Sequence, residues 1–146
     1  MIVPVTIKNI DIAAFIHSVS WQKSHCSFCS PEFISLHTPN HQREYLQEKI
    51  VHGSKIFILI EDDPIGIVAV TGSLIEDLYV LPRCQNCGYG TKLLQFAVSQ
   101  CDGIPTLWIL ENNINAERLY RRNGFKPTGR KNSHTGQLEE VEFSLR

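Results

Sequence analysis

A strand passes through a glycine loop into a helix in the stretch Leu78-Tyr79-Val80-Leu81-Pro82-Arg83-Cys84-Gln85-Asn86-Cys87-Gly88-Tyr89-Gly90-Thr91. Backbone amides exposed at such a helix start, together with the positive end of the helix dipole, favour a phosphate or another anion. Taken alone, the pair Gly88-x-Gly90 also fits a tight turn without a ligand, because glycine adopts conformations that other residues avoid. The surrounding sequence has to decide between the two interpretations.

Two familiar nucleotide-binding motifs do not fit this loop. Leu93 stands where G-x-G-x-x-G requires its third glycine, so the dinucleotide motif is incomplete. Gly90 is followed by Thr91 and Lys92 without the four-residue glycine spacing of a P-loop. What remains is the shorter pattern Gln85-x-x-Gly88-x-Gly90.

The elements on either side of the loop predict a βαβ crossover. Ile75–Val80 is an apolar strand pattern, and the helix after Gly88 carries one apolar stripe, made of Leu93, Leu94, Ala97, Val98 and Cys101. Thr106–Leu110 then forms a nearly continuous apolar run, typical of a buried strand. A strand, a helix and a second buried strand place the two strands parallel to each other.

The rest of the chain alternates between helix and strand periods, which predicts one mixed α/β domain over residues 1–146. Before the loop we expect a strand at Ile2–Ile7, a helix capped by Asn9 with Ile12, Phe15, Ile16 and Val19 on its apolar face, a helix at His41–Val51 carrying Leu46 and Ile50, and a hairpin of Lys55–Ile60 and Ile65–Val70. After it we expect a helix bearing Ala116, Leu119 and Tyr120, then strands at Lys126–Lys131 and Glu139–Leu145.

Composition excludes several classes of protein. Fourteen basic and fifteen acidic side chains give a net charge of −1, so no global field draws the chain to nucleic acid or an anionic membrane. The clearest apolar run, Ile56–Ile60, is far shorter than the ~20 residues of a membrane span. The N-terminal region lacks a signal peptide's long apolar core, and five cysteines suggest reduced thiols, so we expect a cytoplasmic protein.

Two motifs in order resemble the GNAT-type N-acetyltransferases. Gln85-x-x-Gly88-x-Gly90, preceded by a strand and by Val80-Leu81-Pro82, is similar to that family's Q/R-x-x-G-x-G/A acetyl-CoA loop. The segment from Asn112 to Phe125 is similar to its N-x-x-A-x-x-x-Y-x-x-x-G-F pattern. The resemblance implies a mixed, mostly antiparallel sheet flanked by helices, with two parallel central strands splayed to admit the pantetheine arm of acetyl-CoA.

The resemblance also implies roles for individual residues in binding acetyl-CoA as a cosubstrate. The main chain of Leu78, Tyr79 and Val80 would contact pantetheine, Asn115 would lie near the cofactor, and the pyrophosphate would lie on the loop of Gln85, Asn86, Cys87, Gly88, Tyr89, Gly90 and Thr91. Many family members have glycine and then a basic residue where this chain has Asn86 and Cys87, so a cation expected to face the pyrophosphate is absent.

Two residues are candidates for the proton transfers of catalysis. Tyr120 matches the tyrosine that protonates the departing thiolate in the family, although its place on an apolar stripe also fits a core tyrosine. Glu76 is a candidate general base; as strand neighbours, Glu76 and Asp77 should point to opposite faces, with Glu76 on the side of Leu78 and Val80. Asn115 equally suits a helix cap.

The predicted function is transfer of an acetyl group from acetyl-CoA to a primary amine by direct attack, in a monomer or a homodimer, with no metal. The alternative is a non-catalytic module that senses acyl-CoA or binds metal through Cys26-x-x-Cys29 and Cys84-x-x-Cys87, whose internal spacing suits zinc. His37 and His41 have helical spacing, but Pro39 between them argues against a ligand pair. The acceptor amine stays open.

Overall fold

The computed structural model describes residues 1–27, 29–111, 113–133 and 139–146. Its elements alternate along the chain much as the hydrophobic periods predict. In order they are β1 (Ile2–Pro4), α1 (Ile10–His25), α2 (Pro31–Ser35), α3 (Pro39–Val51), β2 (Lys55–Ile60), β3 (Pro64–Thr71), β4 (Leu74–Val80), the 3-10 helix η1 (Pro82–Cys84), α4 (Tyr89–Gln100), β5 (Thr106–Leu110), α5 (Ile114–Arg122), β6 (Phe125–Ser133) and β7 (Glu139–Leu145).

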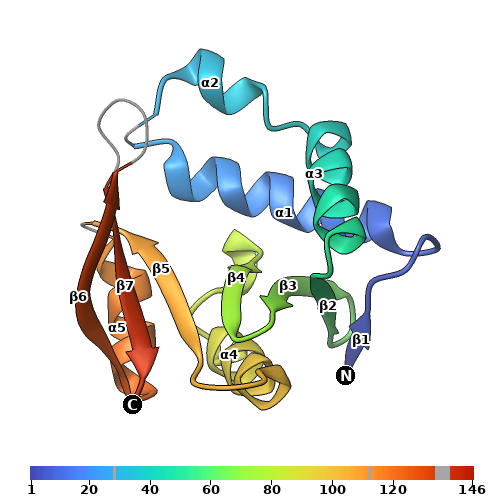
Figure 1. Cartoon of the computed structure of the whole chain (residues 1–146). Helices are drawn as coiled ribbons and strands as arrows, with labels where there is room; N and C mark the ends of the chain where they lie inside the picture. The colour runs from blue at the N-terminus through green and yellow to red at the C-terminus, as the bar shows by residue number, and fades with distance from the viewer. Residues whose placement is uncertain (28, 112, 134–138) are drawn as a thin grey trace.

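Within the described residues, seven strands form one sheet in the order β1-β2-β3-β4-β5-β7-β6. The pairing of β4 with β5 is parallel, and the other pairings among these strands are antiparallel. Helices α1, α2 and α3 lie on one side of the β1–β4 half of the sheet and α4 on the other (Figure 1). The predicted fold, a mostly antiparallel sheet with one βαβ crossover, is therefore confirmed.

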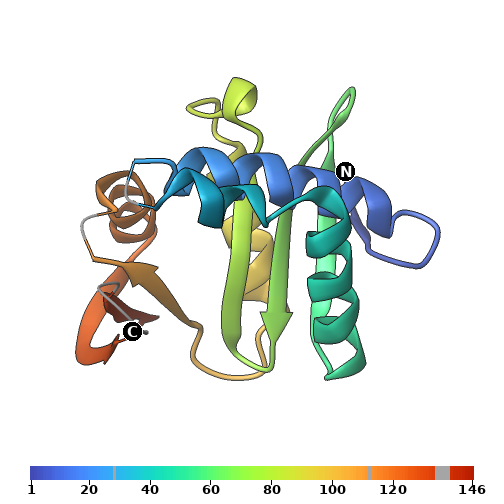
Figure 2. The ribbon, with the colours of Figure 1, turned by 90° about the horizontal axis from the view of Figure 1, so that it is seen from above.

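The two parallel strands separate soon after they begin. Their pairing joins Leu74 to Thr106 and Ile75 to Leu107, whereas β4 continues to Val80. Figure 2 shows β5 running away from β4 beyond this point. The splay predicted by the family resemblance is present, and it leaves one edge of the second half of β4 outside the β4–β5 ladder.

A bulge interrupts β4 where the predicted site residues lie. The register with β3 shifts between Ile67, which pairs with Tyr79, and Ala69, which pairs with Glu76. Asp77 takes up the extra length with φ of 54°, a left-handed conformation that few residues other than glycine adopt. The bulge breaks the alternation of side chains, so the expectation that Glu76 and Asp77 point to opposite faces is wrong.

The apolar core lies between the sheet and its helices. β3 is buried along most of its length because α1 covers one face and α4 the other. The buried face of α1 is not the predicted one. Ile16 is buried as expected, but Ile12 and Phe15 are 42% and 53% exposed. Ala13 and Ala14 are buried instead, since small side chains let the helix pack closely against the sheet.

Local details depart from the sequence expectations at the N-terminal end. β1 stops at Pro4, and Asn9 makes no side-chain bond to the amides of α1; its Oδ1 accepts from the Thr6 amide in the preceding turn. The short helix α2 was not predicted, although Ser30 caps it by accepting from the Phe33 amide. None of the helices among the described residues is long and apolar enough to cross a membrane.

Candidate active site

The loop that follows β4 is tied back to the sheet at both ends. The Leu81 amide donates to the Ile65 carbonyl, 2.8 Å away, and η1 then turns the chain. The side chain of Gln85 donates from Nε2 to the Val80 carbonyl at 3.1 Å. Gln85 therefore holds the loop against the end of the strand, a role that its place in the motif did not reveal.

Two left-handed residues shape the start of α4. Asn86 has φ of 63° and Gly88, the N-cap of α4, has φ of 87°. The amides of a first helical turn have no partner within the helix, and no side chain caps those of α4. A Cβ placed on Gly88 would meet nothing within 4 Å, so the space beside this residue is open. This geometry suits an anion and fits the pyrophosphate role that the motif implies.

Gly90 is explained by a close contact with a neighbouring helix and not by its backbone conformation. A Cβ at this position would lie 3.3 Å from Cδ2 of Leu119 on α5, a tighter contact than side chains normally make. Gly90 therefore lets α4 and α5 approach each other, and its lack of a side chain serves helix packing.

The cations near the loop are already partly engaged. Lys92 in the first turn of α4 forms a 3.2 Å ion pair with Glu61, and the exposed Arg83 donates from Nη1 to Sγ of Cys84 at 3.4 Å. Cys87, which replaces the basic residue of many family members, is exposed. Loop amides and the α4 dipole thus supply the positive potential at this site, with Arg83 and Lys92 at its edge.

Tyr120 lies on α5 as the motif indicates. Its side chain is 8% exposed and its ring centroid lies 6.0 Å from that of Phe125. Burial raises the pKa of Tyr120 to about 12, so the hydroxyl keeps its proton throughout the neutral range. The residue is part of the core, as its place on the apolar stripe predicts, and its hydroxyl carries a proton at neutral pH.

The start of α5 is capped by Asn113, two residues before the expected Asn115. Oδ1 of Asn113 accepts from the Ala116 amide at 3.2 Å, whereas Asn115 lies within the first turn and is exposed. The suggestion that Asn115 caps the helix is therefore wrong. Asn112, which opened the motif segment, lies outside the described residues.

Because of the bulge, both carboxylates of β4 face α1 and α3. Lys49 of α3 lies 2.6 Å from Oε1 of Glu76 and 3.6 Å from Oδ2 of Asp77. Asp77 is also bound by Nε2 of His17, at 2.8 Å, and by the Tyr45 hydroxyl, at 3.0 Å. The expectation that Glu76 shares its side with Leu78 and Val80 fails for the same reason: the ring of Tyr79 joins this group, 5.0 Å from His17.

The surroundings of Asp77 keep it ionised. Burial by itself would raise its pKa, but the hydrogen bond and charge of His17, the charge of Lys49 and the Tyr45 hydroxyl lower the pKa below its ordinary value. Sequence reasoning missed His17, Tyr45 and Lys49, because they lie 28 to 60 residues away from Asp77 and carry no motif.

A hydrogen-bonded chain of side chains leads from Asp77 toward the surface. Nδ1 of His17 lies 2.7 Å from Nε2 of Gln42, and Oε1 of Gln42 lies 2.6 Å from Nδ1 of His41. His17 and Gln42 are each 2% exposed, whereas His41 is exposed. A cavity of about 160 Å³ opens beside this chain, lined by His17, Trp21, His37, His41, Gln42, Tyr45 and Asp77.

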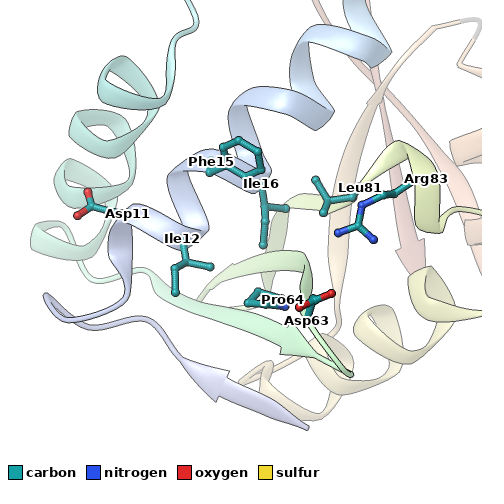
Figure 3. Close-up of a pocket in the computed structure, with 8 residues that line it drawn as sticks. All are labelled: Asp11, Ile12, Phe15, Ile16, Asp63, Pro64, Leu81 and Arg83. Atoms are coloured by element: carbon teal, nitrogen blue, oxygen red, sulfur yellow. The ribbon is translucent and has the colours of Figure 1, made fainter.

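Figure 3 shows a second hollow, of about 540 Å³, at the far end of β4. Ile12 and Phe15 reach it from α1, Pro64 from the start of β3, and Leu81 and Arg83 from the segment after β4. The apolar residues that the sequence assigned to the buried face of α1 thus form the wall of an open surface hollow.

The cysteines do not form a metal site. Across residues 1–27, 29–111, 113–133 and 139–146, no group of three or more His, Cys, Asp or Glu side chains is placed to hold a metal ion. Cys26 and Cys29 lie at the α1–α2 connection, whereas Cys84 and Cys87 lie in the loop between β4 and α4. The alternative of a four-cysteine zinc module has no support in this geometry.

Comparison with known proteins agrees with the fold and the loop. The model of the acetyltransferase (GNAT) domain matches residues 52–127, just over half of the chain. The peptidyl-lysine N-acetyltransferase YjaB of Salmonella typhimurium is 33% identical over 70 residues, 48% of this chain and 48% of that protein. The chain therefore aligns with about half the length of this relative.

Solved structures resemble nearly the whole chain. The apo form of YjaB from Escherichia coli superposes with a TM-score of 0.72 at 20% identity, over 99% of this chain and 96% of that one. The PaiA N-acetyltransferase of Thermoplasma acidophilum, solved in complex with coenzyme A, gives 0.74 at 20% identity, over 97% and 96%. With the family match over β3, β4, the glycine loop and α5, these likenesses confirm the resemblance: this chain belongs to the GNAT acetyltransferase domain family.

Proposed function

We propose that this protein transfers an acetyl group from acetyl-CoA to a primary amine. The observation that carries the proposal is the combination of the splayed strands β4 and β5 with the left-handed loop of Asn86 and Gly88 at the start of α4. The solved neighbours include a complex with coenzyme A and one with acetyl-CoA, which supports acetyl-CoA as the donor. Relatives named peptidyl-lysine N-acetyltransferases support the side chain of a peptide lysine as the acceptor.

In this proposal each predicted residue has a defined task. The Gln85–Thr91 loop binds the pyrophosphate, the main chain of Leu78–Val80 aligns the pantetheine arm, and Asn115 contacts the cofactor. Glu76 takes a proton from the acceptor, whose nitrogen then attacks the thioester carbonyl. The C–N bond forms to give a tetrahedral intermediate. As the intermediate collapses and the C–S bond breaks, the Tyr120 hydroxyl protonates the thiolate, and the nitrogen passes its extra proton through water to the Tyr120 phenolate, which restores the acid. Binding energy serves mainly to position amine and thioester.

The cellular setting is part of the same proposal. The five cysteines are free thiols in the structure, which supports a reducing compartment such as the cytoplasm. The homodimer stays a prediction.

Binding of acetyl-CoA is the first test. Acetyl-CoA at a hundred times its Kd should stabilise the fold by about 2.7 kcal/mol and raise the melting temperature, since it binds the native state. Calorimetry and thermal unfolding measure this, and release of CoA in the presence of a lysine-containing peptide measures turnover. Absence of binding heat at millimolar acetyl-CoA contradicts the proposal; binding without acetyl transfer to any amine identifies a non-catalytic acyl-CoA sensor.

The loop can be tested at Gly88. Gly88→Ala should weaken acetyl-CoA binding about tenfold, because an alanine resists the left-handed conformation by about 1–2 kcal/mol and the loop amides turn away from the phosphate. Gly53→Ala is the matched control: Gly53 has φ of 100° and open space at its Cβ, but lies at the end of α3. Equal acetyl-CoA affinity in the two variants would remove Gly88 from the cofactor site.

A further inference from the structure

The loop between β4 and α4 holds two free thiols, Cys84 and Cys87, whose C-x-x-C motif the proposed acetyl transfer does not use. We propose that these two thiols form a reversible disulfide across the loop, in which Cys87 reacts first with an oxidant and Cys84 completes the bond. The inference goes beyond the proposed function, and only its consequence for acetyl-CoA binding rests on that function.

The backbone between the two thiols is already folded into a turn. Gln85 has φ of −73° and ψ of 160°, and Asn86 follows with φ of 63°. An extended residue followed by a left-handed one is typical of a type II turn, whose first and fourth Cα atoms lie less than about 7 Å apart. These two positions are Cys84 and Cys87. Disulfide-bonded cysteines have Cα atoms about 4.4–6.8 Å apart, so the bond can close without unfolding the loop.

The two thiols differ in their access to solvent. Cys87 is exposed, and its Sγ donates to the Gln85 carbonyl at 3.5 Å, so its side chain folds back over the turn. Cys84, at the end of η1, is partly buried and packs against the apolar core. A dissolved oxidant therefore meets Cys87 first. An accessible cysteine beside a second, resolving cysteine is the usual arrangement of a redox-sensitive site.

Positive groups lie close to both thiols. Nη1 of Arg83 is 3.4 Å from Sγ of Cys84, and Cys87 directly precedes the N-cap of α4, where the helix dipole is positive. Both assist thiol exchange, because sulfur carries negative charge as it attacks and as it leaves. Elsewhere in the chain, burial raises the pKa of the Cys29 and Cys101 thiols, so less of each is the reactive thiolate.

The reaction balances with a small disulfide, such as oxidised glutathione, as the oxidant. The Cys87 thiolate attacks one sulfur of oxidised glutathione, a mixed disulfide forms, and one glutathione thiolate leaves. The Cys84 thiolate then attacks Sγ of Cys87 and displaces the second glutathione thiolate. The two protons from the cysteines pass through solvent to the two glutathione thiolates, so two protein thiols are oxidised and one small disulfide is reduced. Excess reduced glutathione reverses both steps, which makes the bond transient in a reducing compartment.

The second step protects the loop from a bulky adduct. Glutathione attached to Cys87 lies next to Gly88, and its net negative charge repels a phosphate as its bulk covers the start of α4. The Cys84–Cys87 disulfide adds no atoms to the loop and keeps the turn at Gln85 and Asn86. The disulfide form should therefore still bind acetyl-CoA, whereas a loop that stops at the mixed disulfide should not.

The test identifies the disulfide by peptide mass. Trypsin releases residues 84–92 as one peptide, in which Cys84 and Cys87 are the only cysteines. The protein is incubated with oxidised glutathione, and its free thiols are then blocked with iodoacetamide. The peptide from the unaltered protein should be unalkylated and two hydrogen atoms lighter, whereas Cys84→Ser should carry glutathione on Cys87. Cys26→Ser, the same change in the other C-x-x-C motif of the chain, should behave as the unaltered protein does.

Calorimetry on the oxidised proteins measures the consequence for acetyl-CoA. The unaltered protein should keep its Kd within about twofold after oxidation, while glutathione on Cys84→Ser should weaken binding about tenfold or more. A fully alkylated 84–92 peptide, or glutathione that stays on Cys87 of the unaltered protein, would overturn the disulfide. Weakened binding by the disulfide form would overturn the protection. If the reduced protein does not bind acetyl-CoA, the proposed function fails, and the peptide masses still decide whether the disulfide forms.

Discussion

Replacing Tyr120 with phenylalanine should lower the turnover number about 10²–10⁴-fold, the usual contribution of a positioned proton donor. The hydroxyl is removed, but the ring keeps its place in the core against Phe125. Because the cofactor loop lies on another element, the affinity for acetyl-CoA should remain that of the unaltered protein. Steady-state release of CoA measures turnover, and calorimetry measures the affinity.

The pKa of Tyr120 sharpens this prediction. Since burial raises it to about 12, the donor stays protonated at every ordinary assay pH, and its own ionisation should produce no loss of activity below that value. The Tyr120→Phe defect should therefore be the same at pH 6 and at pH 9. If product release limits the unaltered enzyme, single-turnover measurements will show the full effect. If the Tyr120→Phe variant has normal single-turnover rates, Tyr120 is only a core residue and not the proton donor.

Replacing Glu76 with glutamine should lower turnover near neutral pH about 10²–10⁴-fold if Glu76 is the general base. The acceptor is largely an ammonium at this pH, and it has no lone pair for attack until a proton is removed. Oε1 of Glu76 is held by Lys49, and the side chain is 36% exposed, so its second oxygen can face an acceptor. Activity should recover partly at high pH, where solvent supplies free amine.

Two comparisons make the Glu76 result interpretable. Glu48→Gln, at an exposed position of α3, is the control for loss of one carboxylate on this side of the molecule. Asp77→Asn, at the neighbouring carboxylate of β4, should lower turnover less than Glu76→Gln does. A Glu76→Gln enzyme with the unaltered rate across neutral pH would exclude Glu76 and leave Asp77, Glu111 or water to take the proton.

Local features of the sequence were sufficient to predict the loop and the crossover. The change from strand to helix period around Gly88, and the buried run at Thr106–Leu110, depend on residues close together in the chain. The same holds for Tyr120, which stands one turn before the helix end at Asn123. These features can be predicted from the sequence because hydrophobic periodicity and helix-start residues depend only on neighbouring positions in the chain.

Other features depend on contacts that no local pattern encodes. Gly90 is explained by Leu119, on a different helix, and the exposure of Ile12 and Phe15 depends on how closely Ala13 and Ala14 let α1 approach the sheet. A helical period marks which residues share a face, but packing decides which face turns inward.

The sequence by itself determined the family, the proposed phosphate loop and the proposed acid, because each rests on a contiguous motif. Only the tertiary structure decided where the carboxylates of β4 point. One extra residue at Asp77 in the β3–β4 pairing reverses the expected strand alternation and turns two adjacent carboxylates toward the same helices. There they meet His17 of α1 together with Tyr45 and Lys49 of α3. A strand's period predicts side-chain direction only while its register is unbroken, and the fold alone determines where the register breaks.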